Sequence, residues 1–194
     1  MDIRKIFNNI HPISDEALSL IETSMTFQTV KKGEAVIRQG ETTGILLFII
    51  DGIFRIALNS DGKECTLAFG KAGDPFTSVS SLRCDEPSYY SFEAITDAKI
   101  LTLPITKFRE FIDTCTEIAQ WFIAFLLKQI HVLERRAALY SGYNAAKKYE
   151  VFVYNRPEIM RNVPAKYIAQ YLDIAPETLC RIQAAYFKKK KASS

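Results

Sequence analysis

The uneven placement of glycine divides this chain into two parts with different expected secondary structure. Seven of the eight glycines lie between Gly33 and Gly73, and only Gly142 lies beyond them. Glycine at short intervals between apolar runs is typical of turns between β-strands, and its near absence is typical of helices. We therefore expect an α+β protein with a β-rich N-terminal domain followed by a helical C-terminal part.

Short apolar runs separated by turn residues predict an all-β unit before residue 104. The expected strands are 27–30, 35–38, 45–50, 53–58, 66–69, 91–95 and 100–103, preceded by a short helix over 15–21. Ser14 is a good N-cap for that helix. Asp51-Gly52 joins two of the runs and is a strong signal for a two-residue hairpin. Many short strands at this spacing favour a sandwich or a barrel.

Apolar residues recur every seven positions from Ile105 to Leu139, which predicts one long helix with a broad apolar stripe. A stripe this broad must cover more than one surface, and we expect the β domain on one side. A second copy of the same helix, packed as in a coiled coil, would cover the other side. The alternative is that the C-terminal helices of the same chain cover it. The candidate dimer-interface residues are Phe111, Ile118, Phe122, Phe125, Leu126, Val132 and Leu133.

Charge is as unevenly distributed as glycine. Residues 1–139 contain 15 basic and 18 acidic side chains, whereas residues 140–194 contain 10 basic and 4 acidic ones, so the C-terminal part carries +6. A small basic part on a mildly acidic body predicts a polyanionic partner for the C-terminus. The alternative is a solvated basic tail, since the run Lys188–Lys191 supplies four of those charges.

Helices are expected over 144–154, 164–171 and 176–187, and the last two have the spacing of a helix-turn-helix. Ala169 is a small residue that lets two helices cross closely, and Asp173 tolerates a left-handed backbone in the turn. Leu179 and Ile182 then hold the second helix in place, and Pro176 suits its first turn.

The second of these helices carries the candidate DNA contacts, because a recognition helix presents its N-terminal face to base edges. Arg181 suits a guanine edge, Glu177 suits cytosine, and Thr178 suits a phosphate. Four lysines would add salt-dependent attraction to the DNA backbone, namely Lys188, Lys189, Lys190 and Lys191. The alternatives are that Glu177 only caps the helix and that Arg181 is only exposed.

The cysteines and histidines argue against metal and nucleophilic chemistry. The four cysteines show no CxxC spacing, so reduced thiols are expected, and the two histidines lie far apart in the sequence. We expect no enzymatic activity, no metal and no cofactor. No apolar run approaches the length that spans a bilayer, and no signal sequence is evident, so a cytoplasmic protein without a membrane partner is expected.

The order of these elements resembles the Crp–Fnr family of bacterial transcription regulators over roughly residues 7–187. The matching motifs include Lys32-Gly33-Glu34, Gly40-Glu41, 48–55, Gly73-Asp74, 168–172 and 176–182. The resemblance implies a cyclic-nucleotide-binding-like jelly-roll barrel over 1–104, a dimerisation helix over 105–139 and a helix-turn-helix domain over 140–194. It also implies a homodimer that binds double-stranded DNA, in which Glu177 and Arg181 match the base-contacting positions.

The effector pocket departs from the members of this family that bind cyclic AMP. The position of their ribose-binding carboxylate reads Ser78, and the position of their phosphate-binding arginine reads Ser88 or Tyr89. Without that arginine a cyclic phosphate loses a charge-assisted contact, so we expect an unidentified small-molecule effector, or none, instead of cyclic AMP. The candidate pocket residues are Ser78, Ser80, Ser81, Ser88 and Tyr89, and the alternative is that these are ordinary loop hydroxyls.

The DNA-binding part also departs from the family pattern. The β-hairpin wing is not evident, Pro176 stands where a base-reading arginine is common, and Ala175 replaces the usual Ser or Thr cap. These departures keep open a second hypothesis, a ligand-binding or scaffolding module whose DNA-binding domain is degenerate.

Overall fold

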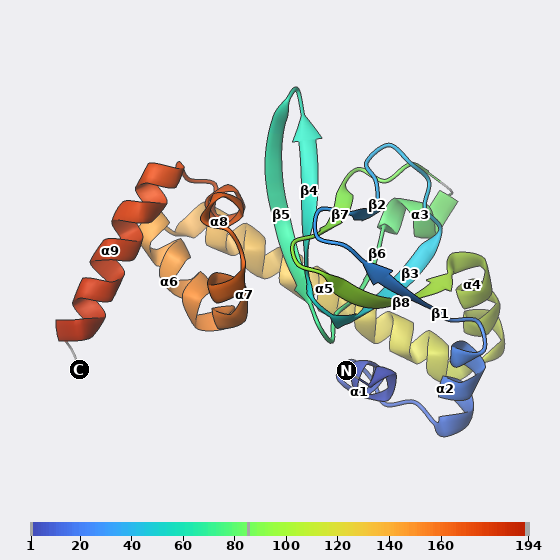
Figure 1. The fold of residues 1–194 in the computed structure, drawn as a ribbon. Helices are drawn as coiled ribbons and strands as arrows, with labels where there is room; N and C mark the ends of the chain where they lie inside the picture. Colours follow the sequence, from blue (N-terminus) through green and yellow to red (C-terminus); the bar gives the residue numbers. More distant parts are fainter. Residues whose placement is uncertain (1, 85, 193–194) are drawn as a thin grey trace.

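The computed structural model describes residues 2–84 and 86–192, and it shows a β-sandwich with helices packed on it and beyond it (Figure 1). The strands are β1 (Thr26–Val30), β2 (Ala35–Ile37), β3 (Ile45–Asp51), β4 (Ile53–Ser60), β5 (Lys63–Lys71), β6 (Pro75–Thr77), β7 (Ser91–Ala94) and β8 (Ala98–Pro104). The helices are α1 (Ile3–Asn8), α2 (Asp15–Glu22), α3 (Val79–Cys84), α4 (Ile105–Thr114), α5 (Thr116–Gly142), α6 (Ala145–Asn155), α7 (Pro157–Asn162), α8 (Ala165–Leu172) and α9 (Pro176–Ala192). We call α6–α9 the head and the rest of the described chain the body.

The strands form two four-stranded antiparallel sheets, in the orders β1-β8-β3-β6 and β2-β7-β4-β5. This interleaved order is that of a double-sheet jelly roll. The expected mixture of helix and sheet is confirmed. The expected barrel is not, because no strand pairing within the described residues joins one sheet to the other.

The prediction of a hairpin at Asp51-Gly52 is wrong. The strands on either side, β3 and β4, belong to different sheets, so these two residues form a corner between the layers. Gly52 has φ +96°, and a Cβ there would lie 2.5 Å from the Cβ of Ala98, so only glycine allows this close approach. The true two-residue hairpin is Asp61-Gly62 between β4 and β5, where both residues have positive φ as a type I′ turn requires.

An aromatic cluster joins the N-terminal helices to the first sheet and to α5. The Phe7 ring lies 5.2 Å from the Phe48 ring and 4.5 Å from the Trp121 ring, centroid to centroid. Trp121 is fully buried, and its Nε1–H donates to the carbonyl oxygen of Phe7 at 3.2 Å. The cap predicted at Ser14 is confirmed, since the Ser14 hydroxyl accepts from the Ala17 amide at 3.2 Å.

The single long helix expected over 105–139 is two helices. Cys115 has an extended backbone, with φ −131° and ψ +108°, and its amide donates to the carbonyl oxygen of Phe111 at 2.8 Å, which ends α4. The apolar repeat continues across this break because both helices present apolar faces to the same core. A seven-residue repeat therefore indicated a shared buried face and not a continuous backbone. The strand β6 and the helices α1, α3 and α7 were not predicted.

Candidate functional site

The helices α8 and α9 are joined by a three-residue turn that begins at Asp173. Asp173 has φ +53° and ψ +53°, so the left-handed backbone predicted from the spacing is confirmed. The Ile174 amide donates to the carbonyl oxygen of Ala169 at 3.1 Å, which ties the turn to α8. Ala169 and Leu179 are buried between the helices of the head, so the small residue and the aliphatic residue lie where the spacing placed them.

The predicted DNA contacts lie at and beyond the start of α9. Glu177 and Arg181 are exposed and one helical turn apart, which places them on one face, whereas Thr178 is half-buried. Lys188 is exposed, and the side chains of Lys189, Lys190 and Lys191 lie outside the described residues. An exposed carboxylate and guanidinium at a helix start can meet base edges or phosphates.

The predicted effector residues do not form one cluster. Ser78 is fully buried, and its Oγ lies 3.0 Å from the Oγ of Ser80. Ser88 is also buried, but its hydroxyl donates to the carbonyl oxygen of Tyr90 at 2.7 Å and so supports a separate turn. Tyr89 is 71% exposed and faces away from the sandwich interior, and the side chain of Ser81 lies outside what the structure describes.

Aromatic rings fill the space between β4, β6 and β7. The Phe54 and Phe92 rings stack at 4.6 Å with a 1° angle between their planes, and the Phe76 ring stacks on Phe92 at 4.0 Å and 6°. Tyr90 lies 5.9 Å from Phe76, and burial raises the pKa of its hydroxyl. These rings are neutral and the Ser88 hydroxyl is bonded within its own turn, so none of these side chains offers a positive charge.

The predicted dimer residues separate into two groups. Phe111, Ile118 and Phe125 are buried in the core of their own chain, so they cannot face a partner and the prediction is corrected at these positions. Phe122 and Leu126 are half-buried, and Val132 and Leu133 are exposed. Three further apolar residues of α5 that were not singled out are more than half exposed, namely Ile123, Leu127 and Ile130.

A buried arginine that the sequence did not single out lies where the body meets the head. Arg55, on β4, is only 2% exposed, and its Nη2 lies 2.6 Å from Glu93 Oε2 and 2.7 Å from Glu64 Oε1. Burial by itself lowers the pKa of Arg55, but hydrogen bonds to Glu64 and then to Glu93 outweigh it and raise the pKa above its ordinary value. The same hydrogen bond from Arg55 is the main reason why the pKa of Glu64 is lowered.

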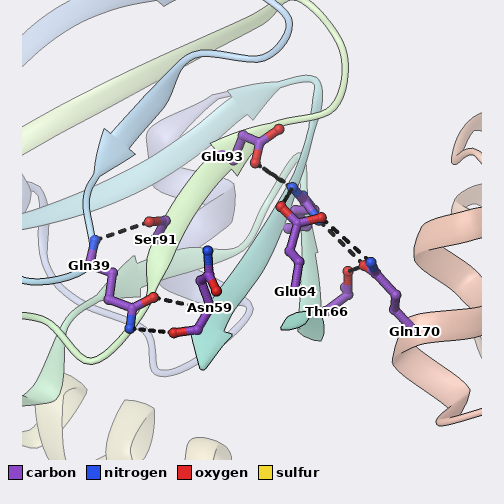
Figure 2. A network of polar contacts seen from close by, with 8 residues as sticks. Gln39, Asn59, Glu64, Thr66, Ser91, Glu93 and Gln170 are labelled. Atoms are coloured by element: carbon purple, nitrogen blue, oxygen red, sulfur yellow. Dashed lines mark hydrogen bonds and ion pairs between the residues drawn. The ribbon is translucent and has the colours of Figure 1, made fainter. Parts of the chain in front are cut away.

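Two side chains of α8, Tyr167 and Gln170, complete this network from the head, and Figure 2 shows Gln170 beside Thr66 and Glu64. Tyr167 lies over the Arg55 guanidinium, with 4.0 Å from the guanidinium carbon to the ring centroid. The Oε1 of Gln170 accepts from the Thr66 hydroxyl at 2.7 Å and lies 3.5 Å from Arg55 Nη1. We call these residues the head contact: Arg55, Glu64, Thr66 and Glu93 of the body with Tyr167 and Gln170 of the head.

One signal in the sequence pointed to the head contact. Arg55 interrupts the otherwise apolar strand 53–58, and a charged side chain inside such a strand is typically paired when it is buried. Its partners on α8 gave no comparable signal, because Gln170 lies 115 positions away.

Residues 27–115 match the family model of the cyclic nucleotide-binding domain. The predicted cyclic-nucleotide-binding-like domain is therefore confirmed over these residues. No curated protein matches the sequence.

Solved structures with the same fold cover nearly the whole chain. FixK2 from Bradyrhizobium japonicum is 19% identical with a TM-score of 0.75, and 86% of each chain is covered. CLP from Xanthomonas campestris, a c-di-GMP responsive global regulator, is 13% identical with a TM-score of 0.71 over 93% of each chain. The catabolite activator protein of Thermus thermophilus is 19% identical with a TM-score of 0.59, over 96% of this chain and 88% of that one. At these identities the likeness shows the fold.

None of the described helices is long and apolar enough to cross a membrane. The described residues also contain no group of three or more His, Cys, Asp or Glu side chains arranged to hold a metal ion.

Proposed function

We propose that this protein is a homodimeric, non-enzymatic transcription regulator of the Crp–Fnr type that binds double-stranded DNA through α8 and α9. The observation that carries the proposal is the pair of helices with a left-handed turn at Asp173, followed by exposed Glu177 and Arg181. This pair lies in the part of the chain that carries +6. The likeness to CLP, a global regulator, and to a catabolite activator protein supports the same function.

In this proposal the start of α9 enters the major groove. Arg181 would pair with a guanine edge and Glu177 would accept from cytosine, whereas Thr178 would donate to a phosphate. Lys188 and the three lysines after it would bind the DNA backbone without regard to sequence. Their contribution would weaken as salt rises, because the counterions that binding releases gain less entropy in a more concentrated salt solution.

The exposed apolar face of α5 would join two copies. Ile123, Leu126, Ile130 and Leu133 follow the alternating three- and four-residue spacing of a coiled-coil seam, and three of them are more than half exposed. Of the predicted interface residues, Phe122, Leu126, Val132 and Leu133 remain in the proposal. Two heads related by such a seam would meet two half-sites on one face of the DNA.

The body would act as a sensor, or as a former sensor, for a molecule other than cyclic AMP. The stacked Phe54, Phe92 and Phe76 rings and the engaged hydroxyl of Ser88 support the exclusion of cyclic AMP. An effector would act only if it bound one pose of the head more tightly than another.

The test begins with a random-site selection that finds the preferred DNA sequence of the full-length protein. Fluorescence anisotropy at several salt concentrations then compares this site with scrambled DNA, and we expect a preference of about 10³-fold or more. Arg181→Ala should weaken binding to the selected site by about 10-fold or more and relax the preference at one base pair.

Arg161→Ala is the matched control, because it removes the same charge from an exposed position on α7. It should weaken binding to selected and scrambled DNA equally. If the wild type shows no sequence preference and only steep salt dependence, the proposal fails. The ligand-binding or scaffolding module with a degenerate DNA-binding domain then becomes the better hypothesis.

A further inference from the structure

We propose that the head contact fixes the orientation of the DNA-binding helices on the body, and that Thr66 and Arg55 are positioning residues for operator recognition. This inference rests on the function proposed above, since orientation matters most when two heads must meet two half-sites. It adds to that function a limit on the spacing between half-sites at which the protein can bind tightly.

The amide of Gln170 is held at both ends by the body. Its Oε1 accepts from the Thr66 hydroxyl at 2.7 Å, and its Nε2 donates to Glu64 Oε2 at 3.5 Å (Figure 2). Thr66 is only 1% exposed, so water cannot readily take the place of Gln170 as its partner. An amide bonded at both ends has one preferred rotation, and this rotation fixes the place of α8 along β5.

Three residues on one face of α8 make the contact, because positions 167, 170 and 171 are neighbours on a helix surface. Tyr167 covers the Arg55 guanidinium at 4.0 Å, and Tyr171 packs against Phe69 of β5 at 5.4 Å, centroid to centroid. Polar and aromatic contacts therefore alternate along the same face. Rotation of α8 about its axis would break both kinds at once.

Two further contacts flank α8 and limit tilting of the head. The Lys71 ammonium of β5 lies 3.0 Å from Glu158 Oε2 of α7, and Arg136 of α5 donates to the carbonyl oxygen of Leu67 while its guanidinium lies over Tyr171. The chain link itself is short and extended, since α5 ends at Gly142 and α6 begins at Ala145. Without the side-chain contacts, this link alone would hold the head.

A fixed head predicts a strict spacing between half-sites. One added base pair moves a half-site by about 3.4 Å and turns it by about 35°, because about 10 base pairs make one turn of 34–36 Å. A head held at several points cannot follow this movement without breaking contacts. A released head can follow it, so it should tolerate changed spacing.

Thr66→Val removes the hydroxyl while keeping the shape of the side chain, and it avoids the unpaired carboxylates that a change of Arg55 would leave. We expect its affinity for a single half-site to stay within about twofold of the wild type. Its discrimination against selected operators with one base pair added or removed between the half-sites should fall about fivefold, the usual effect of one lost hydrogen bond. Thr66→Ser restores a hydroxyl and should restore most of the discrimination.

Thr77→Val is the matched control. Thr77 is also buried, but its hydroxyl donates within the body, to the carbonyl oxygen of Ile45 at 2.8 Å. This variant should lose stability without any change in spacing discrimination. Unchanged discrimination in Thr66→Val would overturn the inference.

Hydrogen exchange of the full-length protein without DNA separates this inference from the proposed function. Thr66→Val should raise the exchange of α8 amides about fivefold over Thr77→Val, because the head opens more often. If the wild type prefers no DNA sequence but this increase is seen, DNA binding fails and the positional role of Thr66 stands. If α8 exchanges equally in both variants, the inference is overturned whatever the DNA results.

Discussion

At the scale of single residues, Arg55 shows how a buried side chain stays charged. Its guanidinium has two carboxylate partners on the neighbouring strands and an aromatic ring above it, so its charge is compensated on three sides. Removal of one partner would leave the remaining charges poorly solvated. Because Tyr167 and Gln170 of α8 also contact Arg55, the network is sensitive to the position of the head.

Glu64 should give this network a measurable dependence on pH. Because the pKa of Glu64 is lowered from 4.5 in the folded protein, its stabilising effect is complete above about pH 4.5 and is lost as the pH falls through the lowered value. Glu64 is 45% exposed, so we expect only about 0.5 kcal/mol. Urea unfolding between pH 7 and pH 3 should show a shallower loss of stability for Glu64→Gln than for the wild type.

Glu110→Gln is the control for this measurement, since Glu110 is 58% exposed and its Lys107 partner lies on the same helix, away from the head. The other charged groups around Glu64 are kept as in the wild type in every variant, namely Arg55, Glu93 and Lys166. Identical pH profiles for Glu64→Gln and the wild type would contradict the expectation.

At the scale of elements, the turn between α8 and α9 depends on a single backbone conformation. Asp173 is one of two described residues other than glycine with positive φ, and it ends α8 while α9 begins three residues later. A left-handed residue reverses the direction of the chain in a short space, at a cost that aspartate tolerates better than most side chains.

Asp173→Ala should destabilise the protein by about 1 kcal/mol, because the left-handed backbone conformation is unfavourable for alanine, which has no polar side chain to form a local hydrogen bond. Asp173→Gly should stay within about 0.5 kcal/mol of the wild type, since easier backbone geometry is offset by a freer unfolded chain. Chemical unfolding followed by circular dichroism measures both. Asp113→Ala, at an exposed position within α4, is the control, and equal stability of Asp173→Ala and Asp173→Gly would refute the assignment.

Local signals explain why some elements could be predicted from the sequence. The Ser14 cap and the turn at Asp173 depend on residues within a few positions, and both are confirmed. The corner at Gly52 was mistaken for a hairpin because both need a glycine with positive φ, and only strand pairing distinguishes them. The head contact was missed because its partners are brought together only by the packing of distant elements.

At the scale of the whole molecule, the described part of the chain leaves one apolar face of α5 uncovered. Ile123, Leu127, Ile130 and Leu133 are each more than half exposed, and the head does not cover them. Burial of each such side chain against a second copy is worth about 1.5–3 kcal/mol. Two-fold symmetry would double every such contribution.

If two copies associate through this face as proposed, Leu133→Asp should leave the protein a monomer at micromolar concentration. Two copies of the substitution meet at a symmetric interface, so the dissociation constant should rise by at least about 100-fold. Sedimentation velocity measures this change. Leu20→Asp, at a 39% exposed leucine of α2, should leave association intact, and a wild type that sediments as a monomer would refute the proposed seam.

The burial of Trp121 has a spectroscopic consequence for the coupling between head and body. This is the sole tryptophan of the chain, and it lies on α5 and packs against Phe7 within the body, so its fluorescence emission follows the unfolding of the body alone. Far-ultraviolet circular dichroism follows the helices of the head as well. Coincident transitions would show that the two parts unfold as one cooperative unit. Separated transitions would show that head and body unfold independently, with fluorescence reporting the body and circular dichroism reporting both.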